Sequence, residues 1–148
     1  MARAKILMIE DNRFLREGIA AMLEGHGDFE VVAPAEDGDV LRELEKSGKS
    51  PDVVPLDLGL EKANSLQLMA LLCTELFEAR AIAMDILPEH PGIVDFVEAG
   101  GSGFSLESAS LFDYMDTIKA VAKGEKVLPT VLTASLFTQN VESARPDT

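Results

Sequence analysis

Short apolar runs alternate with amphipathic helical segments along most of this chain. Five runs of strand length occur, at residues 6–9, 29–33, 53–56, 81–84 and 103–106. Apolar residues recur at helical spacing after each run, in segments 14–24, 40–44, 66–77, 93–97 and 111–121. Strands that alternate with helices form right-handed βαβ units, which bury a parallel sheet between two layers of helices. The pattern therefore predicts one α/β domain with a doubly wound parallel sheet.

Composition restricts the class of protein. The chain has 148 residues, 47% of them hydrophobic, which suits a single folded domain. A formal net charge of −13 and the lack of a Lys/Arg cluster argue against direct nucleic-acid contact by this segment. The single Cys73 is expected in the core, and one cysteine suits a reducing cytoplasm. The first apolar run is too short for a signal peptide or membrane span, so no membrane association is expected.

Carboxylates follow two of the predicted strands directly. Glu10 and Asp11 come after the first run, and Asp57 comes after the third. Ligands of open α/β sheets bind at the carboxyl ends of the strands, where these acids are expected to meet. Carboxylate oxygens are suitable ligands for Mg²⁺ or Mn²⁺, and an aspartate beside such a cation can accept a phosphoryl group as an acyl phosphate.

Four segments carry a family resemblance. Residues 5–12, 51–58 and 99–104 are similar, in order and spacing, to segments of a response-regulator receiver domain. Residues 122–128 resemble the end of receivers that precede a LuxR-type helix-turn-helix domain. The resemblance covers about residues 4 to 137.

The resemblance implies both a fold and a signalling role. The fold would be flavodoxin-like (βα)5, with sheet order 2-1-3-4-5. Asp57 would be the phosphoacceptor, and Glu10, Asp11, Asp57 and the backbone carbonyl of Gly59 would hold Mg²⁺. The partners would be a histidine kinase or phosphotransfer protein and a second copy of the chain in a homodimer. The output would be transcription, controlled through an attached or partner DNA-binding domain.

Several positions depart from the family pattern. Asp85 stands where receivers have Thr or Ser, and Glu107 stands where they have Lys. Phe104 fills the aromatic switch position without a hydroxyl, and Glu61 replaces a usual Pro. Pro55 lies inside the third predicted strand, where its missing N–H is expected to cause local distortion.

These departures predict a crowded acidic site. Two unit charges about 5 Å apart repel by roughly 3 kcal/mol at an effective dielectric near 20. The site must therefore take up a proton, bind a metal, or let Asp85 and Glu107 turn into water. The acids that would share it are Glu10, Asp11, Asp57, Asp85 and Glu107.

Residues 1–124 are expected to form the receiver domain. Residues 125–148 are expected to form a short extra helix at 129–137 and a polar linker or tail, which could lead to an absent output domain. Three functions stay open at this stage. They are a phosphorylatable receiver, a degenerate receiver that acts as a phosphorylation-independent interaction or dimerisation module, and a metal-dependent phosphohydrolase. The third lacks a nucleophile segment, so we expect a domain that signals by protein contact rather than an enzyme.

Overall fold

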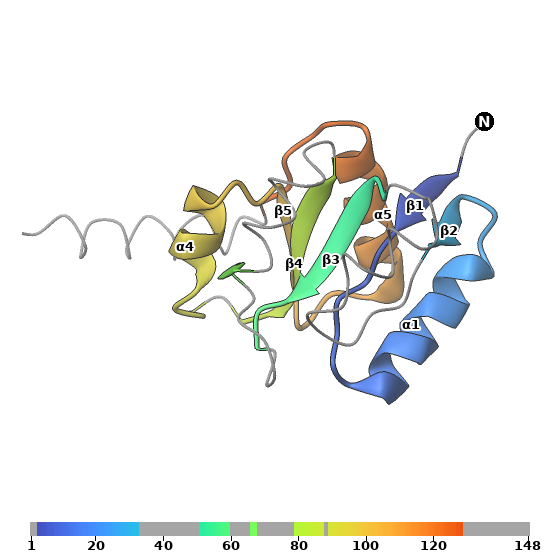
Figure 1. The fold of residues 1–148 in the computed structure, drawn as a ribbon, viewed down its shortest axis with the longest axis horizontal. Coiled ribbons are helices and arrows are strands. Elements are labelled where there is room, and N and C mark those ends of the chain that lie inside the picture. The colour runs from blue at the N-terminus through green and yellow to red at the C-terminus, as the bar shows by residue number, and fades with distance from the viewer. Residues whose placement is uncertain (1–2, 33–50, 60–65, 68–78, 88, 129–148) are drawn as a thin grey trace, which may run out of the picture.

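A five-stranded parallel sheet forms the centre of the domain (Figure 1). The computed structural model describes residues 3–32, 51–59, 66–67, 79–87 and 89–128. The strand order is β2-β1-β3-β4-β5, which confirms the predicted sheet. The strands are β1 (Ala4–Ile6), β2 (Phe29–Val31), β3 (Val53–Asp57), β4 (Arg80–Ile86) and β5 (Gly103–Leu106). The order reverses between β1 and β3, which makes their carboxyl ends the topological switch point.

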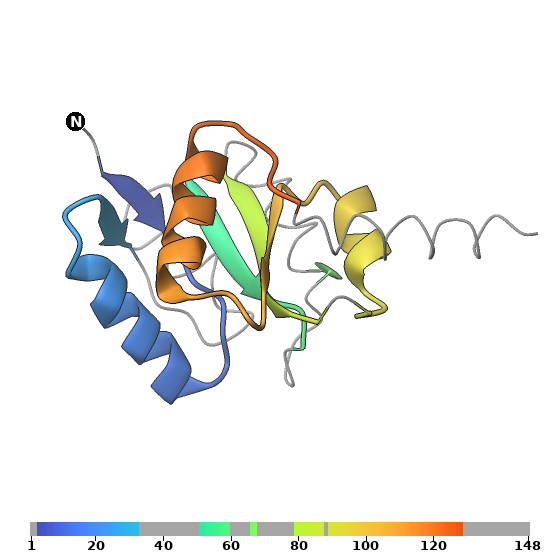
Figure 2. The ribbon, with the colours of Figure 1, turned by 180° about the vertical axis from the view of Figure 1, so that it is seen from behind.

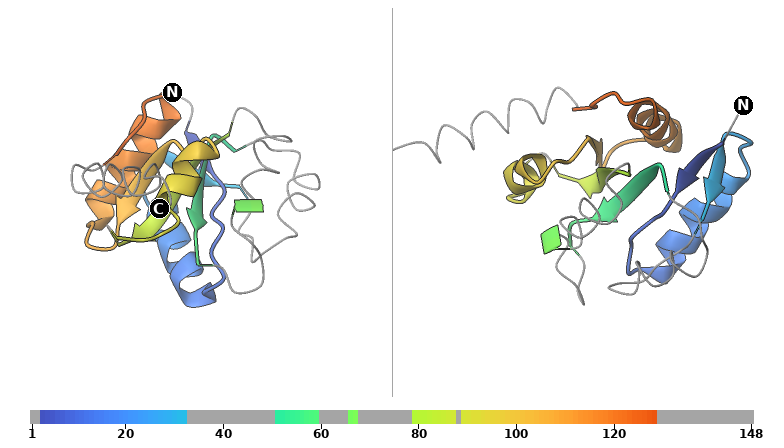
Figure 3. Two further views of the ribbon diagram at one scale, coloured as in Figure 1. Left: turned by 90° about the vertical axis from the view of Figure 1, so that its left-hand side faces the viewer. Right: turned by 45° about the horizontal axis from the view of Figure 1, so that its top comes forward.

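Helices cover both faces of the sheet. The described helices are α1 (Arg13–Glu24), α4 (Ile93–Glu98) and α5 (Leu111–Ala122). Helices α1 and α5 lie on one face and α4 on the other, as Figures 2 and 3 show. The helices predicted at 40–44 and 129–137, and most of the one at 66–77, fall outside the described residues. No helix in the described part of the chain is both long and apolar enough to cross a membrane.

Each face of the sheet packs its own core. On the α4 side, Ile93 and Phe96 contact the sheet residues Leu7, Leu56 and Ala83. On the other side, buried residues of α1 and α5 pack on the sheet. The helix residues are Leu23, Tyr114, Met115, Ile118 and Val121. The residues beneath them are Ile6, Met8, Val53, Ile82 and Met84. Strands buried on both faces explain why the strand segments read as continuous apolar runs.

Pro55 breaks the pairing of β1 with β3, while β3 itself remains continuous. Leu7 N–H donates to the Val53 carbonyl (3.1 Å), and Ile9 N–H donates to the Pro55 carbonyl (2.8 Å). In a parallel ladder, the hydrogen bond between these two would be donated by the N–H of residue 55 to the Leu7 carbonyl. Proline has no N–H, so this bond cannot form. The first strand is present, but its predicted bounds, 6–9, were wrong: β1 is Ala4–Ile6, and beyond it an isolated bridge joins Ile9 to Leu56.

Strand β4 extends two residues beyond the end of the run predicted at 81–84. It continues to Ile86 through an irregularity in its pairing with β5, where Asp85 has a φ of 59°. The extra residue shifts the alternation of side chains by one, so Ile86 joins the α4-side core although Ile82 and Met84 belong to the other. The sequence pattern gave no sign of this bulge.

Candidate functional site

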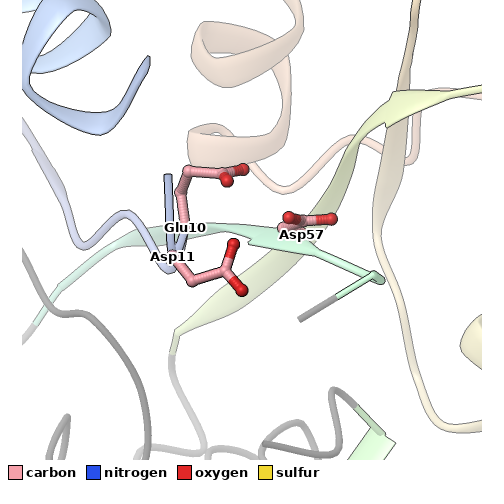
Figure 4. Close-up of side chains that lie close together, drawn as sticks. All are labelled: Glu10, Asp11 and Asp57. Atoms are coloured by element: carbon pink, nitrogen blue, oxygen red, sulfur yellow. The ribbon is translucent and has the colours of Figure 1, made fainter. Parts of the chain in front are cut away.

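Three carboxylates meet where the chain that follows β1 lies beside the carboxyl end of β3. One oxygen from each of Glu10, Asp11 and Asp57 lies within 4.8 Å of the others. In Figure 4 the three side chains point toward a shared space between the segment after β1 and the end of β3. Glu10 is only 4% exposed, while Asp11 and Asp57 are half-buried. The structure thus brings together the acids that the sequence assigned to one site.

The backbone fixes the spacing of the two strand ends. Ile9 N–H donates to Pro55, and Asp57 N–H donates back to the Ile9 carbonyl at 3.0 Å. This exchange clamps the residue before Glu10 against the strand that carries Asp57. Pairing is therefore restored at the point where the acids must be held, just beyond the gap that Pro55 causes.

Local hydrogen bonds orient two of the acids. Glu10 Oε1 accepts the N–H of Asn12 (3.0 Å), and Asp57 Oδ1 accepts the N–H of Gly59 (2.8 Å). Asn12 also caps α1 as predicted, since its side chain accepts the Leu15 N–H at 3.1 Å. The role of the Gly59 carbonyl as a metal ligand remains a prediction.

Arg16 supports the site from beneath, and the sequence analysis missed it. This α1 side chain is 4% exposed, and its Nη1 donates to the Glu10 carbonyl at 2.7 Å. A buried arginine bound to a main-chain carbonyl fixes the path of the chain between β1 and α1. A signal was present, because Arg16 shares helical spacing with the core-facing Ile19 and Leu23.

Burial makes Glu10 a weak acid in the folded protein. Desolvation raises the pKa of Glu10 to about 7, against the lowering effect of the Asn12 hydrogen bond, and the nearby charges of Asp57 and Asp11 add to the rise. The metal-free site therefore relieves its repulsion by taking up a proton on Glu10 as the pH falls through about 7. A divalent cation would replace that proton, and the three convergent oxygens are the hard ligands that Mg²⁺ requires.

We expect metal-free stability to fall as pH rises from about 5 to 8. The folded pKa of Glu10 is about 7 and its ordinary value is 4.5, so the folded state binds the proton more tightly. The stabilisation is complete below the unfolded pKa and is lost as pH rises through the folded pKa. Its size is at most about 3 kcal/mol. Urea unfolding at each pH, in chelator, measures it.

The matched variant is Glu10→Gln, which removes the titrating group and keeps the shape. Its unfolding free energy should change much less between pH 5 and 8 than that of the natural chain. Equal pH dependence in the two proteins would show that Glu10 does not hold the proton.

Asp85 and Glu107 lie apart from the three-acid group. Both are exposed, and both line a cavity between α1 and α5, together with Met84 and Tyr114. The sequence allowed three ways to relieve crowding among five acids, and one of them was that Asp85 and Glu107 turn toward water. The structure has these two side chains exposed to solvent. Phe104, at the predicted switch position, is 2% exposed and packs edge-on against Phe96 with ring centroids 5.1 Å apart.

Known proteins resemble this chain in both sequence and fold. The transcriptional regulatory protein LiaR of Bacillus subtilis is 31% identical over 124 residues, which are 84% of this chain and 58% of LiaR. A LuxR-family two-component response regulator from Aurantimonas sp. SI85-9A1 has a TM-score of 0.76 at 24% identity, covering 95% of this chain and 99% of that one. A Burkholderia pseudomallei response regulator, solved with a phosphorylated aspartic acid and a calcium ion, has a TM-score of 0.68 at 22% identity, covering 82% and 69%. No family model matches the chain.

The fold, the acidic site and these relatives together show that the chain resembles the receiver domains of response regulators. Its sequence relatives are LuxR-type transcriptional regulators of two-component systems. The chain spans 58% of the length of LiaR, which is less than two thirds.

Proposed function

We propose that the domain is a Mg²⁺-dependent phosphoacceptor that relays a two-component signal, with Asp57 as the phosphorylated residue. The observation that carries this proposal is the convergence of Glu10, Asp11 and Asp57 within 4.8 Å at the switch point of the sheet. Asp57 is half-buried and orients one oxygen by accepting the Gly59 N–H. The other oxygen is the nucleophile in this proposal.

The transfer would proceed by attack of an Asp57 oxygen on a phosphoryl group. A phosphorus–oxygen bond to Asp57 forms while the bond to the leaving group of the donor breaks. Bound Mg²⁺ would neutralise charge on the transferring oxygens. Glu10, Asp11 and the Gly59 carbonyl would hold the cation, and deprotonated Glu10 is the form that can do so. Ile9, paired with Asp57, keeps the two strand ends at a fixed separation during the reaction.

The remainder of the pathway is inferred from the relatives. The phosphoryl donor would be a cytoplasmic histidine kinase or a phosphotransfer protein. The output would be a change in transcription through a DNA-binding domain, as the name of LiaR indicates for that protein. The domain would signal through protein contacts, including a homodimer, rather than by catalytic turnover.

A second candidate is a degenerate receiver that works without phosphorylation. Asp85 and Glu107 favour it, because two exposed carboxylates stand where a hydroxyl and an ammonium would contact the phosphoryl group. A carboxylate can neither donate a hydrogen bond to a dianionic phosphoryl group nor attract it, so the contacts that would hold that group are missing. Such a domain would bind the same partners in one constant conformation.

Beryllofluoride, which mimics an aspartyl phosphate, tests the proposal. With millimolar Mg²⁺ it should raise the melting temperature of the natural chain by several degrees, because it binds the folded state alone. Fluorine NMR should show a bound signal. Asp57→Asn keeps the size of the side chain, removes the coordinating carboxylate, and should lose both effects.

A melting temperature that ignores Mg²⁺ and beryllofluoride would favour the degenerate receiver. A response to Mg²⁺ alone would retain the metal site and reject Asp57 as phosphoacceptor. An unchanged response in Asp57→Asn would place the adduct on another residue.

A further inference from the structure

A second site lies in a cavity of about 260 Å³ between α1, α5 and the ends of β4 and β5, and none of the three acids lines it. Two carboxylates line it, those of Asp85 and Glu107, and none of its lining residues is basic. Apolar side chains form the rest of the wall, chiefly Leu15, Ile19 and Leu111. The cavity thus offers negative charge from Asp85 and Glu107 and aliphatic surface from its leucine and isoleucine side chains.

A serine side chain from β5 lines the same cavity. Ser105 is 5% exposed and lines the cavity, and no side chain or backbone group in the described part of the chain accepts or donates a hydrogen bond at its hydroxyl. Nearby, the buried Tyr114 hydroxyl bonds only the sulfur of Met84, at 3.6 Å, among the described residues. Among the described residues, the buried side-chain atom without a partner is Arg16 Nε, so the Ser105 hydroxyl is not sealed in the core; it reaches the cavity, where a ligand atom can bind it.

The backbone is distorted in a way that brings Asp85 into this cavity. The bulge in β4 shifts the side-chain alternation, so Asp85 follows Met84 onto the α1/α5 side of the sheet. Asp85 holds a left-handed φ of 59°, a conformation that Asp tolerates better than most residues with a side chain.

The amino terminus of α5 is a feature of the cavity that would disfavour a cationic ligand, and a capping box offsets it. This terminus borders the cavity and would by itself favour an anion. That terminus is already satisfied by a capping box, in which Ser110 Oγ accepts the Asp113 N–H and Asp113 accepts the Ser110 N–H. Asp113 therefore adds a third negative charge at this end of the helix and offsets the helix dipole.

We propose that this cavity binds a primary ammonium group carried on a short aliphatic chain. The ammonium has three donors, which match the carboxylates of Asp85 and Glu107 and the hydroxyl of Ser105. The aliphatic chain packs against Leu15 and Leu111. The ligand is either a free alkylamine or a lysine side chain of a partner protein, and the site does not depend on phosphorylation of Asp57.

The test is a ¹H–¹⁵N NMR titration of the natural chain with n-butylammonium, in saturating Mg²⁺ so that the three-acid site is filled. The amide signals of Ser105, Leu106 and Ser110 should shift together and saturate. A ligand this small is expected to bind with a Kd on the order of 1–10 mM. Butanol, which has the same chain without the charge, should bind at least about tenfold more weakly.

The variant Asp85→Asn/Glu107→Gln should weaken n-butylammonium at least about tenfold, because it removes both charges and keeps the shapes. The control is Asp95→Asn/Glu98→Gln, which makes the same change of charge on exposed residues of α4. That control should bind like the natural chain, since α4 lies on the opposite face of the sheet.

A lysine blocked at both ends identifies the source of the ammonium. Binding as tight as that of n-butylammonium indicates a partner's lysine, and exclusion of the blocked lysine indicates a free amine; either supports the site. The proposal is overturned if butanol binds equally well, if the α4 control loses as much affinity, or if no saturable shift occurs at these three amides.

Discussion

Replacing Gly101 by alanine is expected to destabilise the domain by about 1–3 kcal/mol, through overpacking. A Cβ at this position would lie 2.1 Å from Cε1 of Phe96. Phe96 is fully buried and packs edge-on against Phe104, so its ring has no free space to move into. Any shift of Phe96 must therefore disturb the core between α4 and β5.

Gly18→Ala is the matched control for this prediction. Gly18 lies within α1, and a Cβ there would meet no atom within 4 Å. Alanine in an exposed helix position should stabilise by about 0.5–1 kcal/mol. Urea unfolding should thus give opposite signs for the two substitutions. A neutral Gly101→Ala would mean that Phe96 is not held against Gly101.

The second large effect is expected from Asp85→Thr, which should cost about 1–3 kcal/mol of stability. The position has a φ of 59°, and a β-branched side chain is strongly disfavoured there. Asp85→Asn should be close to neutral, because Asn tolerates this conformation as Asp does. Chemical denaturation of the three proteins provides the comparison.

This prediction also affects any attempt to restore the family's usual residues. A hydroxyl introduced at position 85 cannot take the place it has in other receivers unless the bulge in β4 is removed. If the Thr variant were as stable as the Asn variant, the backbone at position 85 would be able to leave the left-handed conformation at little cost in stability.

The parallel sheet and the three-acid site could be predicted because they follow from pattern and topology, whereas the strand order came from the family resemblance. Apolar runs that alternate with helical segments define βαβ units, which form a parallel sheet. Acids placed directly after the runs of β1 and β3 must then meet at one edge. Glu10, Asp11 and Asp57 were found in this way, without knowledge of any side-chain contact.

Features that depend on local backbone geometry could not be predicted. The effect of Pro55 was expected within β3, but the register transfers the lost hydrogen bond to β1. The bulge at Asp85 leaves no periodic trace, so the predicted strand ends at residue 84, two residues before the observed end at Ile86. The contact of Gly101 with Phe96 depends on the turn after α4, which no local pattern encodes.

The most direct measurement of the central claim is the intact mass of the protein after incubation with acetyl phosphate and Mg²⁺. The account predicts that the natural chain gains the mass of one phosphoryl group, that chelation of Mg²⁺ prevents the gain, and that Asp57→Asn shows none. A natural chain whose mass stays unchanged under these conditions, or an Asp57→Asn variant that is labelled to the same extent, would contradict it.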